Sequence, residues 1–356
     1  MTAAADAGSA AEVGGTCHHI EGYRNVPGQH CGSTAMRNLT RHYCGLELSE
    51  AMVFGLGSGL HFLLLETELY EPGVLMFGRT ATMEVDFAEA LGLHYTEQTE
   101  PDDAEAWRVV REEVRAGRPT MLSGDALYLD YRDFKVHFPA HRFILLGFDD
   151  EERKALVADR IDEAAQPCAY DALAASRNPK DFISTWNLWG KFHDGRVDHT
   201  IAQACAAAIP RAARRMLEND VGGVQVPEGA AVTATGGLAG LDRLAARLPD
   251  FLARLSGKAL ARYAAACIES FGTGGGNFRV MYSSFLQEVH DAGHLDVRAD
   301  EVEAMRESAR LWTSLSDHLR ACSLGEEAGR VASAVAAVSA IRDIEGRLFE
   351  RLEGLA

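Results

Sequence analysis

Segments with the helical spacing of hydrophobic residues alternate with strand-like segments along the first half of the chain. Ser33–Cys44 places Met36, Leu39 and Tyr43 on one helical face, and Gly45 follows as a C-terminal stop. Further helices are expected at Glu50–Phe54, where Ser49 is a candidate cap, at Thr82–Leu91, which Gly92 ends, and at Pro101–Ala116. Strands are expected at Val74–Phe77, Thr120–Ser123, Arg142–Phe148 and Ala155–Asp159. This half is therefore predicted to be mixed α and β, with its strands concentrated late and Arg142–Phe148 buried on both faces.

The second half has a different pattern, dominated by helical periodicity. Helices are expected at Ile201–Glu218, Leu238–Leu255, Lys258–Phe271, Phe278–Ala292, Arg298–Cys322 and Glu326–Leu355, with a connector at Pro227–Gly237. We therefore predict an α+β protein with a flexible tail at 1–16, a mixed α and β domain at 17–165 and a mainly helical domain at 166–356. The long apolar faces of these helices are compatible with a homodimer.

Composition narrows the class of protein. The chain has 356 residues, of which 47% are hydrophobic and 24% charged, so a sizeable core is possible. Asp and Glu total 52 against 35 Lys and Arg, which gives a net charge of −17 and argues against nucleic-acid binding. The chain has no apolar run of about 18 residues and no N-terminal secretory pattern. We therefore expect a cytoplasmic protein that does not bind membranes.

The seven cysteines do not form a disulfide or zinc pattern. Their number is odd and no CxxC pair occurs, so most are expected to be small buried hydrophobic residues. His290 and His294 are spaced as a helical metal pair, but Gly293 indicates that the helix ends there. Cys17, at the end of the tail, is also not expected to form a site, and we predict no metal.

Cys31 differs from the other cysteines because it lies at or just before the N-terminus of a predicted helix. Unpaired N–H groups and the helix dipole favour a thiolate at that position, and the Cys31 and Gly32 amides are candidates for an oxyanion hole. By position alone, a buried and inert cysteine is the alternative reading. Gln29 and His30, which precede Cys31, are added as substrate-lining candidates.

A base and its orienting group follow later in the chain. His141 precedes the buried strand Arg142–Phe148, and Asp159 ends the next strand. A hairpin would bring these two ends side by side, so Asp159 could orient the His141 ring. The order Cys, His, Asp is that of papain-like enzymes, whose partners meet in space rather than in sequence. A core histidine and a turn aspartate are the structural alternatives.

Two further segments have open interpretations. Gly55–Gly59 lacks the Lys and Ser/Thr of a phosphate loop, so it is read as a turn with positive φ or a close backbone approach, with Gly57 a candidate substrate contact. Asp125 and Tyr128 follow a strand and either face an acceptor or serve turn geometry and packing.

Three blocks in order resemble the N-terminal signature of the butirosin biosynthesis protein H family. They are PGQHCGSTAMRNLTRHYCGLELSEAMVFGLGSGLHF, GRPTMLSGDALYLDYR and HRFILLGFDD with LVADR. FGTGGGNFRVMYSSFLQEV resembles the domain commonly fused to this family. The resemblance implies a papain-like domain of the bacteriocin-processing-peptidase type followed by a helical domain.

The resemblance also implies an activity. Family members move an acyl group from an acyl carrier protein, where phosphopantetheine carries it as a thioester, to an amine or hydroxyl acceptor, with no other cofactor. Cys31 would be the nucleophile, His141 the base and Asp159 its orienting group. Independently of the resemblance, glycines at a predicted helix start make Arg279 a candidate to hold a pantetheine phosphate, and the alternative is that these glycines only dock the helix against the catalytic domain. A hydrolase or peptidase, an intramolecular cyclisation and a non-catalytic carrier-binding protein remain as alternatives.

Overall fold

The computed structural model describes residues 17–68, 71–181, 183–223, 231–254, 256–326 and 328–355. The predicted tail at 1–16 lies outside these residues. The chain forms two compact units. The smaller contains residues up to Tyr23, Thr99–Ala158 and Ala164–Trp189, and the larger contains Arg24–Gln98, Asp159–Glu163 and Gly190–Ala356. The division of the sequence at residue 165 stays a prediction.

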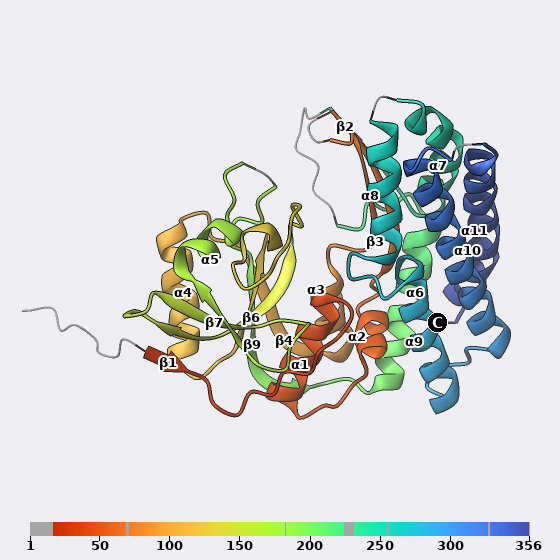
Figure 1. The fold of residues 1–356 in the computed structure, drawn as a ribbon. Helices are drawn as coiled ribbons and strands as arrows, with labels where there is room; N and C mark the ends of the chain where they lie inside the picture. The colour runs from red at the N-terminus through yellow and green to blue at the C-terminus, as the bar shows by residue number, and fades with distance from the viewer. Residues whose placement is uncertain are drawn as a thin grey trace, which may run out of the picture. The chain divides into compact units, whose positions relative to one another are not determined.

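An antiparallel sheet forms the centre of the smaller unit. Its strands follow the order β5 (Thr120–Gly124), β6 (His141–Asp149), β7 (Lys154–Ala158) and β8 (Gln166–Ala169), and β1 (Cys17–His19) pairs with β6. The helices α4 (Asp103–Arg115) and α5 (Tyr170–Arg177) lie beside this sheet (Figure 1). A short helical turn, η1 (Ala126–Tyr128), follows β5.

The core of the smaller unit is built on β6. Every residue from His141 to Phe148 is buried, which confirms the expected burial of this strand on both faces. Phe143 and Leu145 pack there with Val110 of α4 and with Trp189. Burial of such side chains stabilises a fold by about 1.5–3 kcal/mol each, so this core fixes the ends of β6 firmly.

The larger unit contains a small sheet and most of the helices. Its antiparallel sheet has the order β10 (Val232–Gly236), β2 (Leu60–Thr67) and β3 (Val74–Arg79). Outside this sheet, β4 (Leu93–Gln98) neighbours β9 (Trp189–Val197). Its helices are α1 (Cys31–Cys44), α2 (Glu50–Leu56), α3 (Met83–Leu91), α6 (Ile201–Leu217), α7 (Gly237–Leu252), α8 (Gly257–Glu269), α9 (Arg279–Ala292), α10 (Ala299–Ser323) and α11 (Arg330–Glu353). A short turn, η2 (Gly276–Phe278), precedes α9.

Packing among the late helices forms the main body of the larger unit. Helix α10 lies beside α8 and α11, and α11 lies beside α7 (Figure 1). The six helices expected after residue 200 are all present within a few residues of their predicted bounds. The C-terminal region is therefore mainly helical, as expected. No helix within the described ranges combines the length and the apolar character needed to cross a membrane.

Several helix ends follow the predicted signals. Gly45 and Gly92 both adopt left-handed conformations, with φ of 65° and 63°, at the ends of α1 and α3. Ser49 caps α2 by accepting a hydrogen bond from the Met52 N–H. These local signals are confirmed.

Some predicted loop and tail segments are strands. Cys17–His19 pairs with β6 and so is not part of a tail. β4, β8 and β9 were not predicted, and β10 lies in the segment interpreted as the Pro227–Gly237 connector, part of which falls outside the described residues. These short strands are held by hydrogen bonds to strands distant in sequence. Their own residues therefore show no clear alternation of hydrophobic and polar positions.

Candidate functional site

Cys31 is the first residue of α1 in the larger unit. His30 has extended backbone geometry as the N-cap, and the first hydrogen bond of the helix runs from Thr34 N–H to the His30 carbonyl. The first N–H groups of a helix have no acceptors within the helix itself. Cys31 is buried, with 7% of its surface exposed. The predicted location of the thiol at a helix start is confirmed.

Glu50 at the start of α2 holds the loop that leads into Cys31. Its carboxylate accepts hydrogen bonds from the backbone N–H groups of Gln29 and His30, at 2.9 and 2.6 Å, and from the Ser33 and Thr34 hydroxyls, both at 3.1 Å. The Gln29 N–H is therefore engaged and its side chain is exposed. One carboxylate thus binds backbone N–H groups before the cysteine and side-chain hydroxyls after it.

His30 has a capping role. Its Nδ1 lies 3.2 Å from the Ser33 backbone nitrogen and 3.0 Å from the Ser33 hydroxyl, and its Nε2 lies 3.1 Å from the Arg79 guanidinium. Arg79 forms two 3.0 Å hydrogen bonds with the buried Glu84. Both ring nitrogens are occupied and the residue is 4% exposed, so the geometry favours positioning of α1 over the expected contact with substrate.

Gly32 lies against this ion pair, which leads to a stability prediction. A Cβ at Gly32 would be 2.3 Å from Glu84 Oε1 and 2.7 Å from Arg79 Nη1. Gly32→Ala is therefore expected to reduce the free energy of unfolding by about 1–3 kcal/mol, because the buried pair must shift. Urea denaturation measures this change.

Gly346→Ala is the matched control, because this glycine in α11 has no atom closer than 3.5 Å to an added Cβ. The control should be neutral or stabilising by up to about 1 kcal/mol. Equal stability of the Gly32→Ala variant and the control would show that the ion pair does not press on the start of α1.

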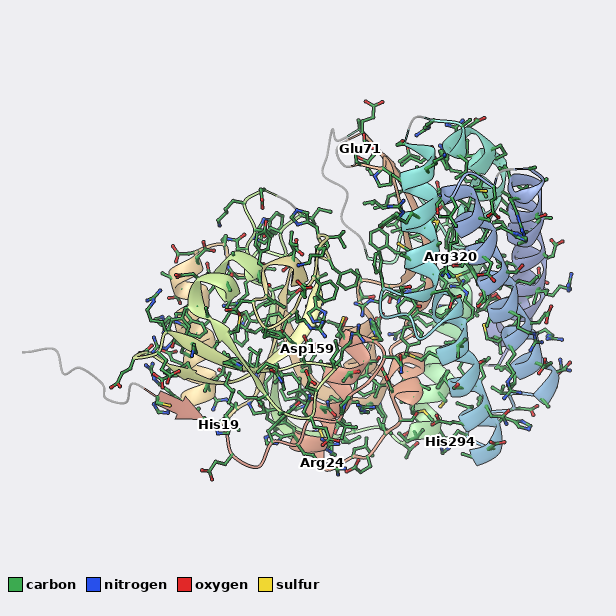
Figure 2. All side chains as sticks on the ribbon, in the orientation of Figure 1. His19, Arg24, Glu71, Asp159, His294 and Arg320 are labelled. Atoms are coloured by element: carbon green, nitrogen blue, oxygen red, sulfur yellow. The ribbon has the colours of Figure 1, made fainter. Side chains whose placement is uncertain are left out.

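Asp159 directly follows β7 and belongs to the same compact unit as Cys31 (labelled in Figure 2). It is buried, and its Oδ1 accepts a hydrogen bond from the Arg160 N–H at 2.6 Å. Its backbone carbonyl accepts a 2.7 Å hydrogen bond from the Asn25 amide, whose oxygen accepts one from Asn38 of α1 at 2.8 Å. A buried network therefore ties the Asp159 backbone to the helix that begins with Cys31.

His141 opens β6 in the smaller unit. It is 1% exposed and lies among the rings of Phe134, Phe138 and Phe143, with centroids 6.0–6.5 Å away. Its Nε2 is 3.5 Å from the Arg132 guanidinium. Because β6 and β7 are antiparallel, β6 begins at the same end of the ladder at which β7 ends and the chain continues into Asp159. The expected hairpin geometry is confirmed; the catalytic roles remain a proposal.

Asp125 serves turn geometry in the loop after β5. Its buried carboxylate accepts hydrogen bonds from the Leu127 and Phe138 N–H groups, at 3.1 and 2.8 Å, and contacts His137 Nδ1 at 2.7 Å. These contacts favour the structural interpretation of Asp125. This contact orients the His137 ring. His137 was not predicted as a candidate residue, because its carboxylate partner Asp125 is distant in sequence.

Tyr128 is half-buried and donates a hydrogen bond to Asp181. That hydrogen bond, together with burial, raises the pKa of Tyr128 to about 12. The phenol therefore remains protonated at neutral pH and is held as a donor to Asp181.

The glycine-rich segment 55–59 is not a single turn. Gly55 lies inside α2, and Ser58, not a glycine, has the positive φ of 46°. A Cβ at Gly55 would be 2.1 Å from the Phe285 ring, and one at Gly57 would be 2.6 Å from the Met83 carbonyl. Close packing, rather than positive φ, explains these glycines, and Gly57 faces α3.

Arg279 is a structural residue, which contradicts the expected phosphate contact. The side chain has no exposed surface and forms two 2.8 Å hydrogen bonds with the buried Glu345. It also donates to the carbonyls of His61 and Asn277, each at 2.9 Å, and lies over the Trp312 ring. A guanidinium with these partners has no face available to a phosphate.

The histidine pair at the end of α9 does not share a helix face. Gly293, with φ of 62°, ends the helix, and His294 lies beyond it (Figure 2). His290 Nδ1 is 2.7 Å from the Val297 carbonyl. Across the described part of the chain, no three His, Cys, Asp or Glu side chains converge to hold a metal ion.

The other cysteines mostly match the expected structural role. Cys168, Cys205, Cys267 and Cys322 are buried. Burial raises the pKa of Cys205 and of Cys267 to about 12. These two thiols are therefore poor nucleophiles at neutral pH.

Comparison with known families is consistent with this arrangement. The family model of "Butirosin biosynthesis protein H, N-terminal" matches residues 30–160. The model of a "Domain of unknown function (DUF4872)" matches residues 171–352. None of the curated proteins compared with the chain matches it. The two matched ranges cover most of the chain, and the first begins just before Cys31.

Proposed function

The chain belongs to the family in which the N-terminal domain of butirosin biosynthesis protein H precedes DUF4872, and from this premise we propose that it is a cysteine-dependent acyltransferase. Its role would lie in antibiotic biosynthesis of the butirosin type. The observation that carries the proposal is the location of Cys31 at the start of α1, within the range matched to that family. Cytoplasmic location is part of the same proposal.

The donor is proposed to be an acyl carrier protein with its acyl group on phosphopantetheine. The Cys31 sulfur attacks the thioester carbonyl, a C–S bond to Cys31 forms, and the C–S bond to pantetheine breaks. The proton of the Cys31 thiol passes through His141 to the leaving sulfur. Because one thioester replaces another, this step requires little driving force.

The second step releases the acyl group to a small-molecule amine or hydroxyl. The acceptor attacks the acyl-enzyme carbonyl, its proton passes to His141, and the Cys31 sulfur leaves. Asp159 would orient the His141 ring during both proton transfers. The amides of the first turn of α1 would stabilise the oxyanion, since helix-start N–H groups lack helical acceptors.

A papain-like fold for the catalytic domain belongs to this proposal. The order Cys31, His141 and Asp159 supports it, as does the antiparallel pair of β6, which begins at His141, and β7, which Asp159 follows. Burial supports it too, because all three side chains are at most 7% exposed. Shielding from bulk water protects an acyl-enzyme against hydrolysis.

Acyl transfer and hydrolysis would use the same triad, so the ratio of amide to free acid among the products distinguishes them. The acyl-enzyme is expected to transfer to an added amine faster than it loses its acyl group to water, because the thioester reacts in a shielded site. The measurement incubates the protein with an acyl-pantetheine, with and without a panel of amines, and quantifies amide and free acid by mass spectrometry.

Free acid as the sole product, at a rate independent of every amine, would identify a hydrolase. A product with the mass of the free acid minus water would identify cyclisation. Acyl transfer is supported only if amide forms at the expense of acid as the amine concentration rises.

A further inference from the structure

The glycine-rich segment before α9 reaches the loop that carries Cys31. A Cβ at Gly272 would lie 3.4 Å from the Gln29 carbonyl, and one at Gly274 would lie 3.7 Å from Gln29 Cβ. Both residues belong to the range matched to the domain of unknown function. The companion domain therefore packs against the loop that precedes Cys31, which agrees with the docking interpretation of this segment.

Phe278, at the end of this segment, contacts the cap of α1. Its ring centroid is 5.1 Å from that of His30, with the planes at 88°, and 5.0 Å from that of Phe54, with the planes at 4°. Phe54 is itself 5.9 Å from His30. Two stacked phenylalanine rings thus pack edge-on against the imidazole, and one of them comes from the companion domain.

The backbone around Phe278 is unusually constrained. Gly272, Gly274, Gly275 and Gly276 all have positive φ, and so do Asn277 at 51° and Phe278 at 71°. A left-handed conformation at a large non-glycine side chain is uncommon and persists only where the surroundings determine it. Several contacts within the larger unit hold this backbone in place.

Those contacts tie the segment to the late helices. Gly276 N–H donates to Glu269 of α8 at 3.2 Å, and a Cβ at Gly276 would lie 2.9 Å from the Ala309 carbonyl of α10. Arg279, the next residue after Phe278, is held by the buried ion pair with Glu345 of α11. The segment is therefore anchored on one side and presents Phe278 to His30 on the other.

We propose that Phe278 is a positioning residue for Cys31 and acts through His30. The Phe278 ring keeps the imidazole in the rotamer that caps the Ser33 N–H and contacts Arg79. That cap fixes the first turn of α1, and so the direction of the Cys31 sulfur and of the first amides. The inference rests on the proposed nucleophilic role of Cys31 and gives the companion domain a part in it.

The test compares Cys31 alkylation by iodoacetamide across pH in Phe278→Leu and Phe285→Leu. Phe285 is the matched control, because it is a buried phenylalanine of α9 that packs on Gly55 instead of His30. Peptide mass spectrometry follows Cys31 alone. Phe278→Leu is expected to slow the alkylation of Cys31 about tenfold at neutral pH. Without the Phe278 ring the His30 imidazole no longer caps α1, and the first N–H groups of the helix lose their orientation toward the thiolate. The pH dependence of the alkylation rate should change in Phe278→Leu and stay that of the wild type in Phe285→Leu.

Two further variants separate positioning from general destabilisation. Phe278→Tyr retains the ring and should restore the wild-type profile. His30→Asn retains a good N-cap but removes the imidazole. In that background Phe278→Leu should change the alkylation rate less than about twofold, since a residue acting through His30 has nothing left to position. Thermal unfolding checks that all variants are folded.

Equal alkylation profiles for Phe278→Leu and Phe285→Leu would overturn the inference. A tenfold loss that persists in the His30→Asn background would overturn it as well. If wild-type Cys31 takes no acyl group from thioesters yet shows the Phe278-dependent alkylation, the proposed function fails and the positioning role stands. If it is acylated but insensitive to Phe278→Leu, the positioning role alone fails.

Discussion

Replacing Cys31 with alanine is expected to lower the acyl-transfer rate by at least about a thousandfold. Removing the nucleophile of a catalytic triad typically has this effect or a larger one, because no covalent intermediate forms. The side chain is small and lies at the first position of α1, so the fold should persist. The rate of amide formation from an acyl-pantetheine and an amine gives the comparison.

Cys17→Ala is the matched control for this variant. Cys17 is an exposed thiol on β1, so its loss tests whether any accessible cysteine contributes to turnover. It should leave the rate unchanged within about twofold. Full activity of Cys31→Ala, alongside normal circular dichroism, would contradict covalent catalysis at Cys31.

The second large effect is expected at His141. His141→Ala should lower the transfer rate by about 10²- to 10⁴-fold, because a general acid–base group contributes that much. His141→Gln should be equally impaired, since an amide fills the site but does not exchange a proton. Steady-state kinetics with saturating thioester measure both variants.

His193→Ala serves as the control, because His193 is an exposed histidine of β9. It should retain normal activity. If His141→Gln were as active as His193→Ala, another group would have to remove the proton, and the assignment of the base would be wrong.

Helix ends and the location of Cys31 were predictable from local sequence. Gly45 ends α1 because glycine tolerates the left-handed conformation found there, and Ser49 caps α2 through its hydroxyl. Pro27-Gly28 followed by Cys31 and a helical pattern predicted a thiol at a helix start. Such signals act within one turn of the chain, so they appear in a single sequence.

The groups that hold Cys31 in place could not be found in this way. Glu50, Glu84 and Phe278 come from three separate elements, and none carries a local pattern that connects it with Cys31. Asn38 of α1, whose buried amide donates to Asn25, was likewise not predicted from the sequence. Only the fold shows that these residues share one neighbourhood.

Arg279 shows the opposite error. Glycines before a helix, followed by an arginine, fit an anion site in sequence. The structure instead gives the arginine a buried carboxylate from α11, a partner that no local pattern reveals. A buried guanidinium with a bidentate partner stabilises the packing of helices and has no role in binding phosphate.

The most direct test of the central claim locates the acyl group itself. The protein is incubated with an acyl-pantetheine in the absence of acceptor, quenched in acid, digested and examined by tandem mass spectrometry. The account predicts one acyl mass on the peptide that contains Cys31, which is lost on addition of an acceptor amine and never formed in Cys31→Ala. An acyl mass on another residue, or amide formation with no adduct on Cys31 at any time, would contradict it.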